Sequence, residues 1–309
     1  METPLAKVVM ETAVVTLLTV GSGWLPGVTS PSAGQTPPVP TPAGNLTASE
    51  TALNQGLLLL QQGQVEQAQA KFEEAIALDP NQAAAHYNLG LLLRQQGQLQ
   101  EAASAFWQAL RADPNFAMAY ANLGGALLEG NNLEQAEAYL RRALAIQPDL
   151  GNAYYNLGLV LQAQGRTNEA LAALEQAAQY STHAPEPYFQ QGIIYLQAGQ
   201  YDDAITALNQ ALEIQPQYPQ AHYNLGLAYF NQGQVATALD AFRRATQLNG
   251  RYADAYYSAG LAFIQLGEYE EARRVLEYAK NLYITQGSPA WAAKAQTHLS
   301  RLPVGASSP

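Results

Sequence analysis

A period of 34 residues runs through most of the chain and restricts its fold more than any other feature. The segment HYNLGL occupies residues 86–91 and returns at 222–227, and YYNLGL occupies residues 154–159 between them. From Ser49 to Gln286 the chain divides without insertion or deletion into seven units, residues 49–82, 83–116, 117–150, 151–184, 185–218, 219–252 and 253–286. Such a period is typical of a repeat architecture, because one unit cannot bury its apolar face alone and must stack on its neighbours.

The pattern inside each unit predicts two helices. Positions 4, 7, 8 and 11 of the unit form one stripe at helical spacing, and positions 20, 24, 27 and 28 form a second. Position 15 is glycine in six units and Asn131 in the third, and both residue types end a helix by entering the left-handed conformation cheaply. Position 8 is glycine and position 20 alanine in every unit, so we expect that alanine to pack against the bare backbone of the glycine.

This spacing of aromatic, Leu-Gly, alanine and proline positions resembles the tetratricopeptide repeat across residues 49–286. The following segment SPAWAAKAQTHLSRL resembles the solvating C-terminal helix of that family, with Ser288 as N-cap and Trp291, Ala295, Leu299 and Leu302 covering the last stripe. The resemblance implies an all-α, right-handed superhelical solenoid. It also implies that the first helix of each pair faces a concave groove, with a capping helix at 287–302 and a tail at 303–309.

The N-terminal residues differ in composition from the repeats. Residues 1–30 contain the apolar run TAVVTLLTV, which is shorter than the roughly 20 residues of a spanning helix and is closer to a secretory signal. Residues 31–48 form a proline-rich linker that cannot pack a core. These features predict export to the periplasm or a place beside a membrane, and a plain leader on a cytoplasmic protein is the alternative.

If the first stripe packs inward, the free face of the first helix carries positions 2, 5, 6, 9, 12 and 13. Position 6 is an amide in six units, and an amide can pair with both groups of one peptide unit in a bound chain. The amides are Asn54, Asn88, Asn122, Asn156, Gln190 and Asn224. They resemble the asparagine ladder of O-linked N-acetylglucosamine transferases. The alternative is a consensus residue of the family that holds no ligand.

Position 5 adds aromatic side chains to the same predicted face. The aromatic residues are Tyr87, Tyr155, Phe189, Tyr223 and Tyr257. The third unit has Ala121 and Gly125 on this face, which predicts a recess for a bulky partner side chain. Arg94 at position 12 is the one basic residue found on this face, so the sequence argues against a clamp for a C-terminal carboxylate.

Composition and motifs give no support to catalysis, nucleic-acid binding or a metal site. The chain has no cysteine, and its formal charge is −10 from 15 basic and 25 acidic residues. His86 and His222 replace the usual tyrosine at position 4, so we interpret them as packed aromatic residues, and no two histidines have a zinc-binding spacing. We therefore expect no cofactor, no metal and no enzymatic activity.

The sequence favours a non-catalytic scaffold that binds an extended segment of another protein in its groove through the amides and aromatic residues. The alternative is a structural accessory or assembly factor that docks to an envelope or thylakoid complex through its convex face or its cap.

Overall fold

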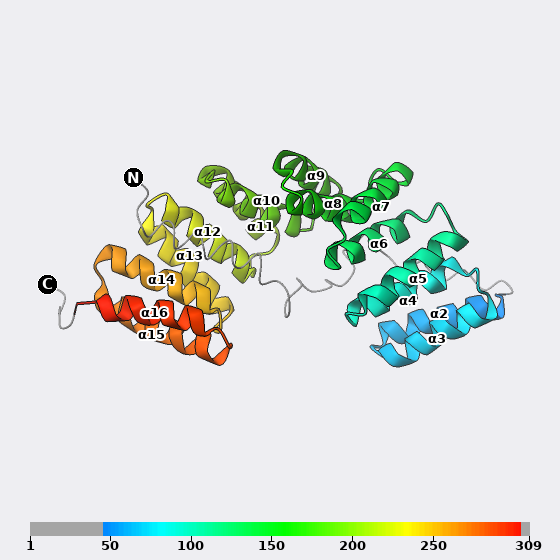
Figure 1. Cartoon of the computed structure of the whole chain (residues 1–309), viewed down its shortest axis with the longest axis horizontal. Coiled ribbons are helices and arrows are strands. Elements are labelled where there is room, and N and C mark those ends of the chain that lie inside the picture. The colour runs from blue at the N-terminus through cyan, green and yellow to red at the C-terminus, as the bar shows by residue number, and fades with distance from the viewer. Residues whose placement is uncertain (1–45, 304–309) are drawn as a thin grey trace. The chain divides into compact units, whose positions relative to one another are not determined.

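A computed structural model describes residues 46–303, and these residues form two compact units, 46–183 and 184–303. The described residues are helical hairpins that follow one another in chain order (Figure 1). The first unit contains α2 (Ala48–Gln61), α3 (Val65–Leu78), α4 (Ala83–Gln95), α5 (Leu99–Ala112), α6 (Ala117–Glu129), α7 (Leu133–Ile146), α8 (Gly151–Ala163) and α9 (Thr167–Tyr180). The second contains α10 (Glu186–Gln197), α11 (Tyr201–Ile214), α12 (Pro219–Asn231), α13 (Val235–Leu248), α14 (Ala253–Leu266), α15 (Tyr269–Thr285) and α16 (Pro289–Arg301).

The predicted all-α fold of stacked helix pairs is confirmed. Each 34-residue unit contributes one hairpin, and its turn lies at position 15 as expected. Five of the glycines there, together with Asn131 (φ 58°) and Gly267 (φ 78°), have positive φ, which ends the first helix of every pair. The predicted leader and most of the linker lie outside the described residues, as does the tail beyond Pro303.

The glycine at position 8 is required because of the side chain at position 24, whereas we expected the alanine at position 20 to be the reason. A Cβ atom at Gly226 would lie 2.5 Å from Cε1 of Phe242, and one at Gly192 would lie 2.6 Å from Cγ of Leu208. Phe242 and Leu208 occupy position 24, so the large side chain of the second helix fills the space over the glycine. The position-20 alanine, fully buried in every unit, lies beside this contact rather than at its centre.

Positions 3, 5 and 10 of the first helix join consecutive units, and the sequence pattern did not single out positions 3 and 10. At position 10, for example, Leu92 is 2% exposed and Val160 is fully buried. Leu58, the same position of the first pair, is 54% exposed because none of the described residues precedes α2 in the stack. This burial pattern therefore reflects stacking between units.

The two compact units meet in sequence within the irregular segment YSTHAPEP. The fourth pair lacks the proline of position 32, having Thr182 in its place, and the division falls between His183 and Ala184. Helix α10 begins at Glu186, one position later than its equivalents, with Pro185 as its N-cap residue. The other irregular joint, at Gly250, lies inside the second unit.

Helix α16 follows the last pair and packs against α15. Ser288 is the N-cap residue and Pro289 the first helical residue, although the Ser288 side chain makes no capping hydrogen bond. Ala295, Leu299 and Leu302 are buried. The Trp291 ring lies 5.9 Å from that of Tyr257, so the cap rests on the last repeat through an aromatic contact.

Candidate functional site: the inner face

Within each compact unit, the first helices of the pairs contact one another more than the second helices do. Helix α6 packs against α8, and α12 packs against α10, with smaller contacts from α6 to α4 and from α12 to α14, whereas no two second helices of the described residues contact each other to this degree. We call the free surface of the first helices, at positions 2, 5, 6, 9, 12 and 13, the inner face.

The amides of position 6 lie on this face, but several of their donors are already used. Asn88 Nδ2 donates to the Ala84 carbonyl at 2.7 Å, and Asn224 Nδ2 donates to the Gln220 carbonyl at 2.8 Å. Asn88, Asn122 and Gln190 are buried, while Asn54, Asn156 and Asn224 are partly exposed. A ladder needs both a donor and an acceptor from each amide. An amide whose Nδ2 atom already donates to its own helix therefore has fewer hydrogen bonds to give to a bound chain than the sequence suggested.

Asn122 links two neighbouring units. Its Nδ2 atom donates to the Met118 carbonyl at 3.0 Å and lies 3.1 Å from the hydroxyl oxygen of Tyr87 in the preceding pair. Its Oδ1 atom accepts from Arg94 Nη1 at 3.3 Å. Each of these contacts is internal to the fold, which matches the alternative interpretation of this asparagine as a structural residue.

The expectation of exposed aromatic residues at position 5 is wrong for three of the five. Tyr87, Tyr223 and Tyr257 are 5%, 1% and 0% exposed. The Tyr223 ring lies between Phe242, at 6.0 Å, and Tyr252, the N-cap residue that joins this unit to α14, at 5.0 Å. Position 5 is therefore part of the seam between units.

Burial raises the pKa of the Tyr87 hydroxyl to about 12, a value lowered slightly by Arg94 and by the hydrogen bond with Asn122. Tyr155 and Phe189 remain partly exposed on the inner face. These two are the position-5 aromatic residues within reach of a ligand.

The recess predicted at Ala121 and Gly125 is filled by Arg94. A Cβ atom at Gly125 would lie 3.1 Å from Arg94 Nη2 and 3.2 Å from Asn156 Nδ2, so the guanidinium group lies directly over the glycine. Arg94 Nε donates to Glu129 Oε1 at 3.0 Å, and Nη2 contacts the same oxygen. The side chains are 26% and 15% exposed, and Glu129 Oε2 is buried without a hydrogen-bond partner.

The inner face carries little free positive charge. Arg94 is the only basic residue on the seven first helices, and Glu129 neutralises it. The acidic residues on these helices are Glu50, Glu129, Glu186 and Asp254. Burial raises the pKa of Asp254, which accepts a 2.6 Å hydrogen bond from Tyr283. The face therefore suits neutral or basic ligands and offers no clamp for a terminal carboxylate.

The inner face of residues 46–183 is the more open of the two. At positions 9 and 12 this compact unit has four partly exposed leucines and the buried Leu57, whereas the second compact unit has two partly exposed isoleucines and four buried residues, Leu196, Leu227, Phe230 and Leu261. With the partly exposed amides and Tyr155, the four leucines make a mixed apolar and amide surface, which we call the inner patch. The inner patch consists of Asn54, Leu60, Leu91, Leu128, Tyr155, Asn156 and Leu159.

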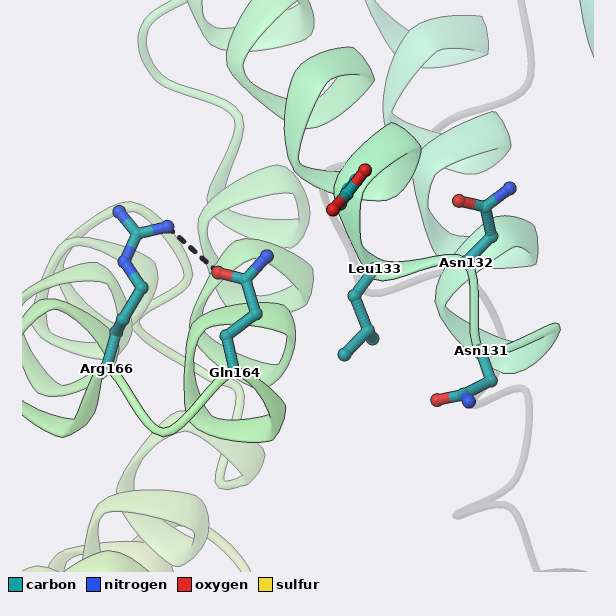
Figure 2. A pocket seen from close by; sticks show the side chains of 6 residues that line it. Asn131, Asn132, Leu133, Gln164 and Arg166 are labelled. Atoms are coloured by element: carbon teal, nitrogen blue, oxygen red, sulfur yellow. Dashed lines mark hydrogen bonds between the residues drawn. The ribbon is translucent and has the colours of Figure 1, made fainter.

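A cleft lies beside the helix turns of the same compact unit, between the third and fourth pairs. It has a volume of about 780 Å³ and is lined by residues that include Asn131, Asn132, Gln164 and Arg166 (Figure 2). Asn132 already accepts a hydrogen bond from the backbone of Gln135 as the N-cap of α7. Gln164 and Arg166, which also line the cleft, are hydrogen-bonded to each other and to Glu137.

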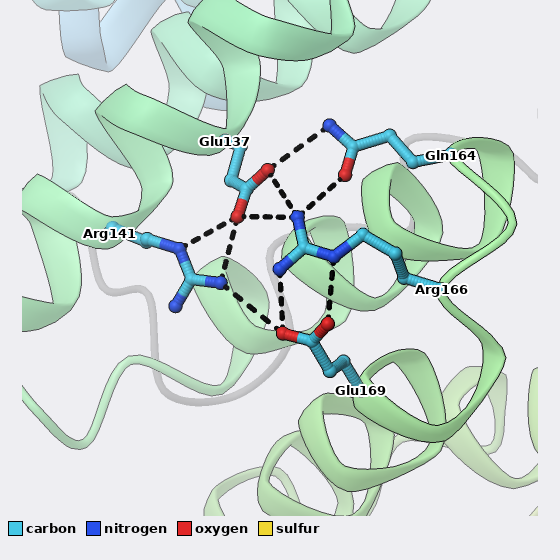
Figure 3. A network of polar contacts seen from close by, with 5 residues as sticks. All are labelled: Glu137, Arg141, Gln164, Arg166 and Glu169. Atoms are coloured by element: carbon cyan, nitrogen blue, oxygen red, sulfur yellow. Dashed lines mark hydrogen bonds and ion pairs between the residues drawn. The ribbon is translucent and has the colours of Figure 1, made fainter.

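A charged network behind this edge joins the third and fourth pairs. Arg166 Nη1 lies 2.8 Å from Glu137 Oε2, and its Nη2 atom lies 2.6 Å from Glu169 Oε2 (Figure 3). Burial alone would raise the pKa of Glu137, but hydrogen bonds from Arg141, Arg166 and Gln164 outweigh it and bring the pKa to about 2. These ion pairs link the third repeat to the fourth.

Within residues 46–303, no three His, Cys, Asp or Glu side chains are placed to hold a metal ion. His86 Nε2 lies 2.9 Å from the Pro80 carbonyl and His222 Nε2 lies 3.0 Å from the Pro216 carbonyl, so both rings are half-buried packing residues. Among these residues, no helix combines the length and apolar character needed to cross a bilayer.

Sequence comparisons identify the repeats. Family profiles described as tetratricopeptide repeat match residues 53–115, 93–158, 219–252 and 253–283, and a profile described as TPR repeat matches 192–233. A profile of subunit 3 of the anaphase-promoting complex, cyclosome, matches residues 129–211. A comparison with curated proteins finds no match.

Solved structures with the same arrangement are numerous. The chain is 26% identical to YrrB, described as a TPR protein with an unusual peptide-binding site, with a TM-score of 0.52 over 63% of this chain and 99% of YrrB. A tetratricopeptide repeat protein from Parabacteroides merdae ATCC 43184 is 19% identical, with a TM-score of 0.61 over 80% of this chain and 98% of that one. PilW, a type IV pilus biogenesis factor, is 21% identical, with a TM-score of 0.62 over 68% and 97%. The last two similarities concern the fold alone.

Proposed function

Because the chain belongs to the tetratricopeptide repeat family, a family of interaction scaffolds, we propose that it binds an extended segment of another protein on the inner patch. The observation that carries this proposal is the contrast between the two units at positions 9 and 12. Four leucines stay partly exposed at these positions in residues 46–183, against two isoleucines in residues 184–303, and amides flank the leucines. An apolar surface with flanking amides suits a chain held by its backbone and by alternate apolar side chains.

The ligand should be neutral or basic and extended. The only described cation near the inner patch, Arg94, is paired with Glu129, and Glu50 adds negative charge at one end of the surface. Asn54 and Asn156 supply the amide contacts in this proposal, and Asn88 and Asn122 support the surface from below. The similarity to YrrB, whose description includes a peptide-binding site, supports a peptide ligand.

Affinity capture from the native lysate with the full chain tests this assignment. The informative variant is Leu91→Gln with Leu128→Gln, since both side chains are partly exposed and their loss should not open the core. Each substitution removes about 1 to 2 kcal/mol of apolar contact with a ligand, so capture should weaken at least roughly tenfold. The matched control is Leu78→Gln, which changes a leucine that is 52% exposed on a second helix.

Two other outcomes would contradict the proposal. If the inner variant, shown to be folded by circular dichroism, retains its partner, the inner patch is not the binding surface. If Leu78→Gln loses the partner instead, the scaffold acts through its outer face, as an accessory or assembly factor would. Export or a position beside a membrane remains our proposal for location, resting on the composition of residues 1–30.

A further inference from the structure

A cleft opens on the outer face of residues 46–183, away from the inner patch. It has a volume of about 370 Å³ and lies between the second helices α3 and α5, with α4 as its floor. Leu89 and Leu93 of α4, Ile76 of α3 and Ala105 of α5 supply its apolar surface. We call it the outer cleft.

The equivalent space beside the third pair is closed by aromatic side chains. The residue at position 4 of the third pair, Tyr120, stacks on Tyr139 with ring centres 6.0 Å apart, and Arg142 lies over the Tyr120 ring at 6.0 Å. Tyr154 stacks on Tyr180 at 5.7 Å in the fourth pair. Tyr180 lies at position 30, so only the stack of Tyr120 and Tyr139 occupies positions equivalent to those that line the outer cleft.

The second pair lacks both halves of this aromatic plug. Position 4 is His86, whose Nε2 atom is held by the Pro80 carbonyl at 2.9 Å. The residue equivalent to Tyr139 is Ala105, and the one equivalent to Arg142 is Gln108. Compared with the third pair, the outer cleft is therefore open because His86, Ala105 and Gln108 are smaller than Tyr120, Tyr139 and Arg142, and its volume lies at the lower end of the range for ligand pockets.

The rim of the outer cleft is acidic. Glu73 of α3 and Glu101 of α5 line it, both are exposed, and no lysine or arginine of the described residues lines it. The nearest basic side chains along these helices are engaged elsewhere: Lys71 pairs with Glu74 at 2.6 Å, and Arg111 lies over the Trp107 ring at 5.3 Å. An occupant must therefore combine an apolar body with a positive charge.

We propose that the outer cleft docks a basic segment of a partner protein, which inserts one arginine or lysine side chain between α3 and α5. The methylene stem of that side chain lies on Leu89 and Leu93, and its charged head pairs with Glu73 and Glu101. Ser104 and Gln108 at the same rim provide further polar contacts. The net charge of −10 favours approach of such a segment.

Nuclear magnetic resonance of the full chain tests the proposal with defined probes. The probes are the peptides acetyl-Leu-Arg-Leu-amide and acetyl-Leu-Glu-Leu-amide, and the signals are the methyl groups of Leu89, Leu93 and Ala105. We expect saturable shifts with the arginine peptide and none with the glutamate peptide. The variant Glu73→Gln with Glu101→Gln keeps the shape of the cleft and should weaken binding roughly tenfold.

A plugged variant is the matched control for shape. His86→Tyr with Ala105→Tyr copies the stacked pair of Tyr120 and Tyr139 and should abolish the shifts while keeping the helical fold. Should that variant fail to fold, the Glu73→Gln and Glu101→Gln variant still decides the matter. The proposal is overturned if no saturable shift occurs, if both peptides shift the signals equally, or if binding survives the loss of both carboxylates.

The inner-patch variant separates this proposal from the proposed function. Leu91→Gln with Leu128→Gln should leave the response of the outer cleft unchanged, because neither residue lines it. Loss of the cleft response in that variant would contradict a separate outer site, whereas loss of partner capture alone would concern the inner patch only.

Discussion

Replacing Gly226 by alanine should destabilise the protein, although alanine is the better helix former. In the middle of α12 the change would gain about 1 kcal/mol from helix propensity. The added Cβ atom, however, would lie 2.5 Å from Cε1 and 2.6 Å from Cδ1 of Phe242. Favourable contacts between carbon atoms lie near 3.5–4.0 Å, so the phenyl ring must move by about 1 Å.

The Phe242 ring has little room to move. Its side chain is fully buried, and Tyr223 packs against it with ring centres 6.0 Å apart. Overpacking of a well-filled core costs about 1 to 3 kcal/mol, which exceeds the propensity gain. We expect Gly226→Ala to lower the free energy of unfolding by roughly 1 kcal/mol.

The sign should reverse when the phenyl ring is removed. Phe242→Ala alone should cost about 3 to 5 kcal/mol. In that background the added Cβ atom at position 226 meets no ring, so Gly226→Ala should stabilise by up to about 1 kcal/mol. The two substitutions thus form a double-mutant cycle with an interaction energy of about 2 kcal/mol.

Urea unfolding of the full chain, followed by helical circular dichroism, measures each corner of this cycle. Gly250→Ala is the control, because a Cβ atom there would meet no heavy atom within 4 Å and the residue lies in a turn. Stabilisation by Gly226→Ala with Phe242 present would refute the reasoning. So would destabilisation by Gly226→Ala in the protein that already carries Phe242→Ala.

Three further predictions concern two ion pairs and the contact between the C-terminal helix and the last repeat. The pKa of Glu137 is about 2, below its ordinary 4.5, so its contribution is full above about pH 4.5 and is lost as pH falls toward 2. Glu137→Gln should therefore flatten the acid side of a melting-temperature profile, and an unchanged profile would contradict the network. Arg94→Ala leaves Glu129 buried and unpaired and should cost about 1 to 3 kcal/mol in urea unfolding, with partial recovery when Glu129→Ala is added. Trp291→Ala should loosen the cap and speed hydrogen exchange in α14 and α15 while sparing α2 and α3, whereas uniform change along the chain would exclude a local cap.

The repeated helix pairs were predicted correctly from the properties of single residues. The glycines and Asn131 at position 15 end the first helices through their own backbone preference, a property of single residues that needs no tertiary contact. The number and length of the helix pairs follow from an uninterrupted 34-residue period. Even the division of the described residues into two units falls at the joint where Thr182 replaces proline.

Which face of each first helix is buried was harder to predict from the pattern. Positions 4 and 5 are both aromatic in several units, and a helical stripe of either one satisfies the same periodicity. The structure buries Tyr87, Tyr223 and Tyr257 at position 5, because a second packing partner lies there at the joint to the following helix: Phe116, Tyr252 and Trp291, respectively. Stacking between units thus turned part of a predicted binding surface into core.

What the sequence determined by itself is the fold and its period, because helix propensity, turn chemistry and the apolar stripe all operate within one 34-residue unit. What only the tertiary structure decided is which side chains remain available to a ligand. The guanidinium group of Arg94 fills the space left by Gly125, a residue of the following unit. The groove closed by Tyr120 and Tyr139 in one pair stays open beside His86 in another. Both outcomes depend on contacts between units, and no single unit contains them.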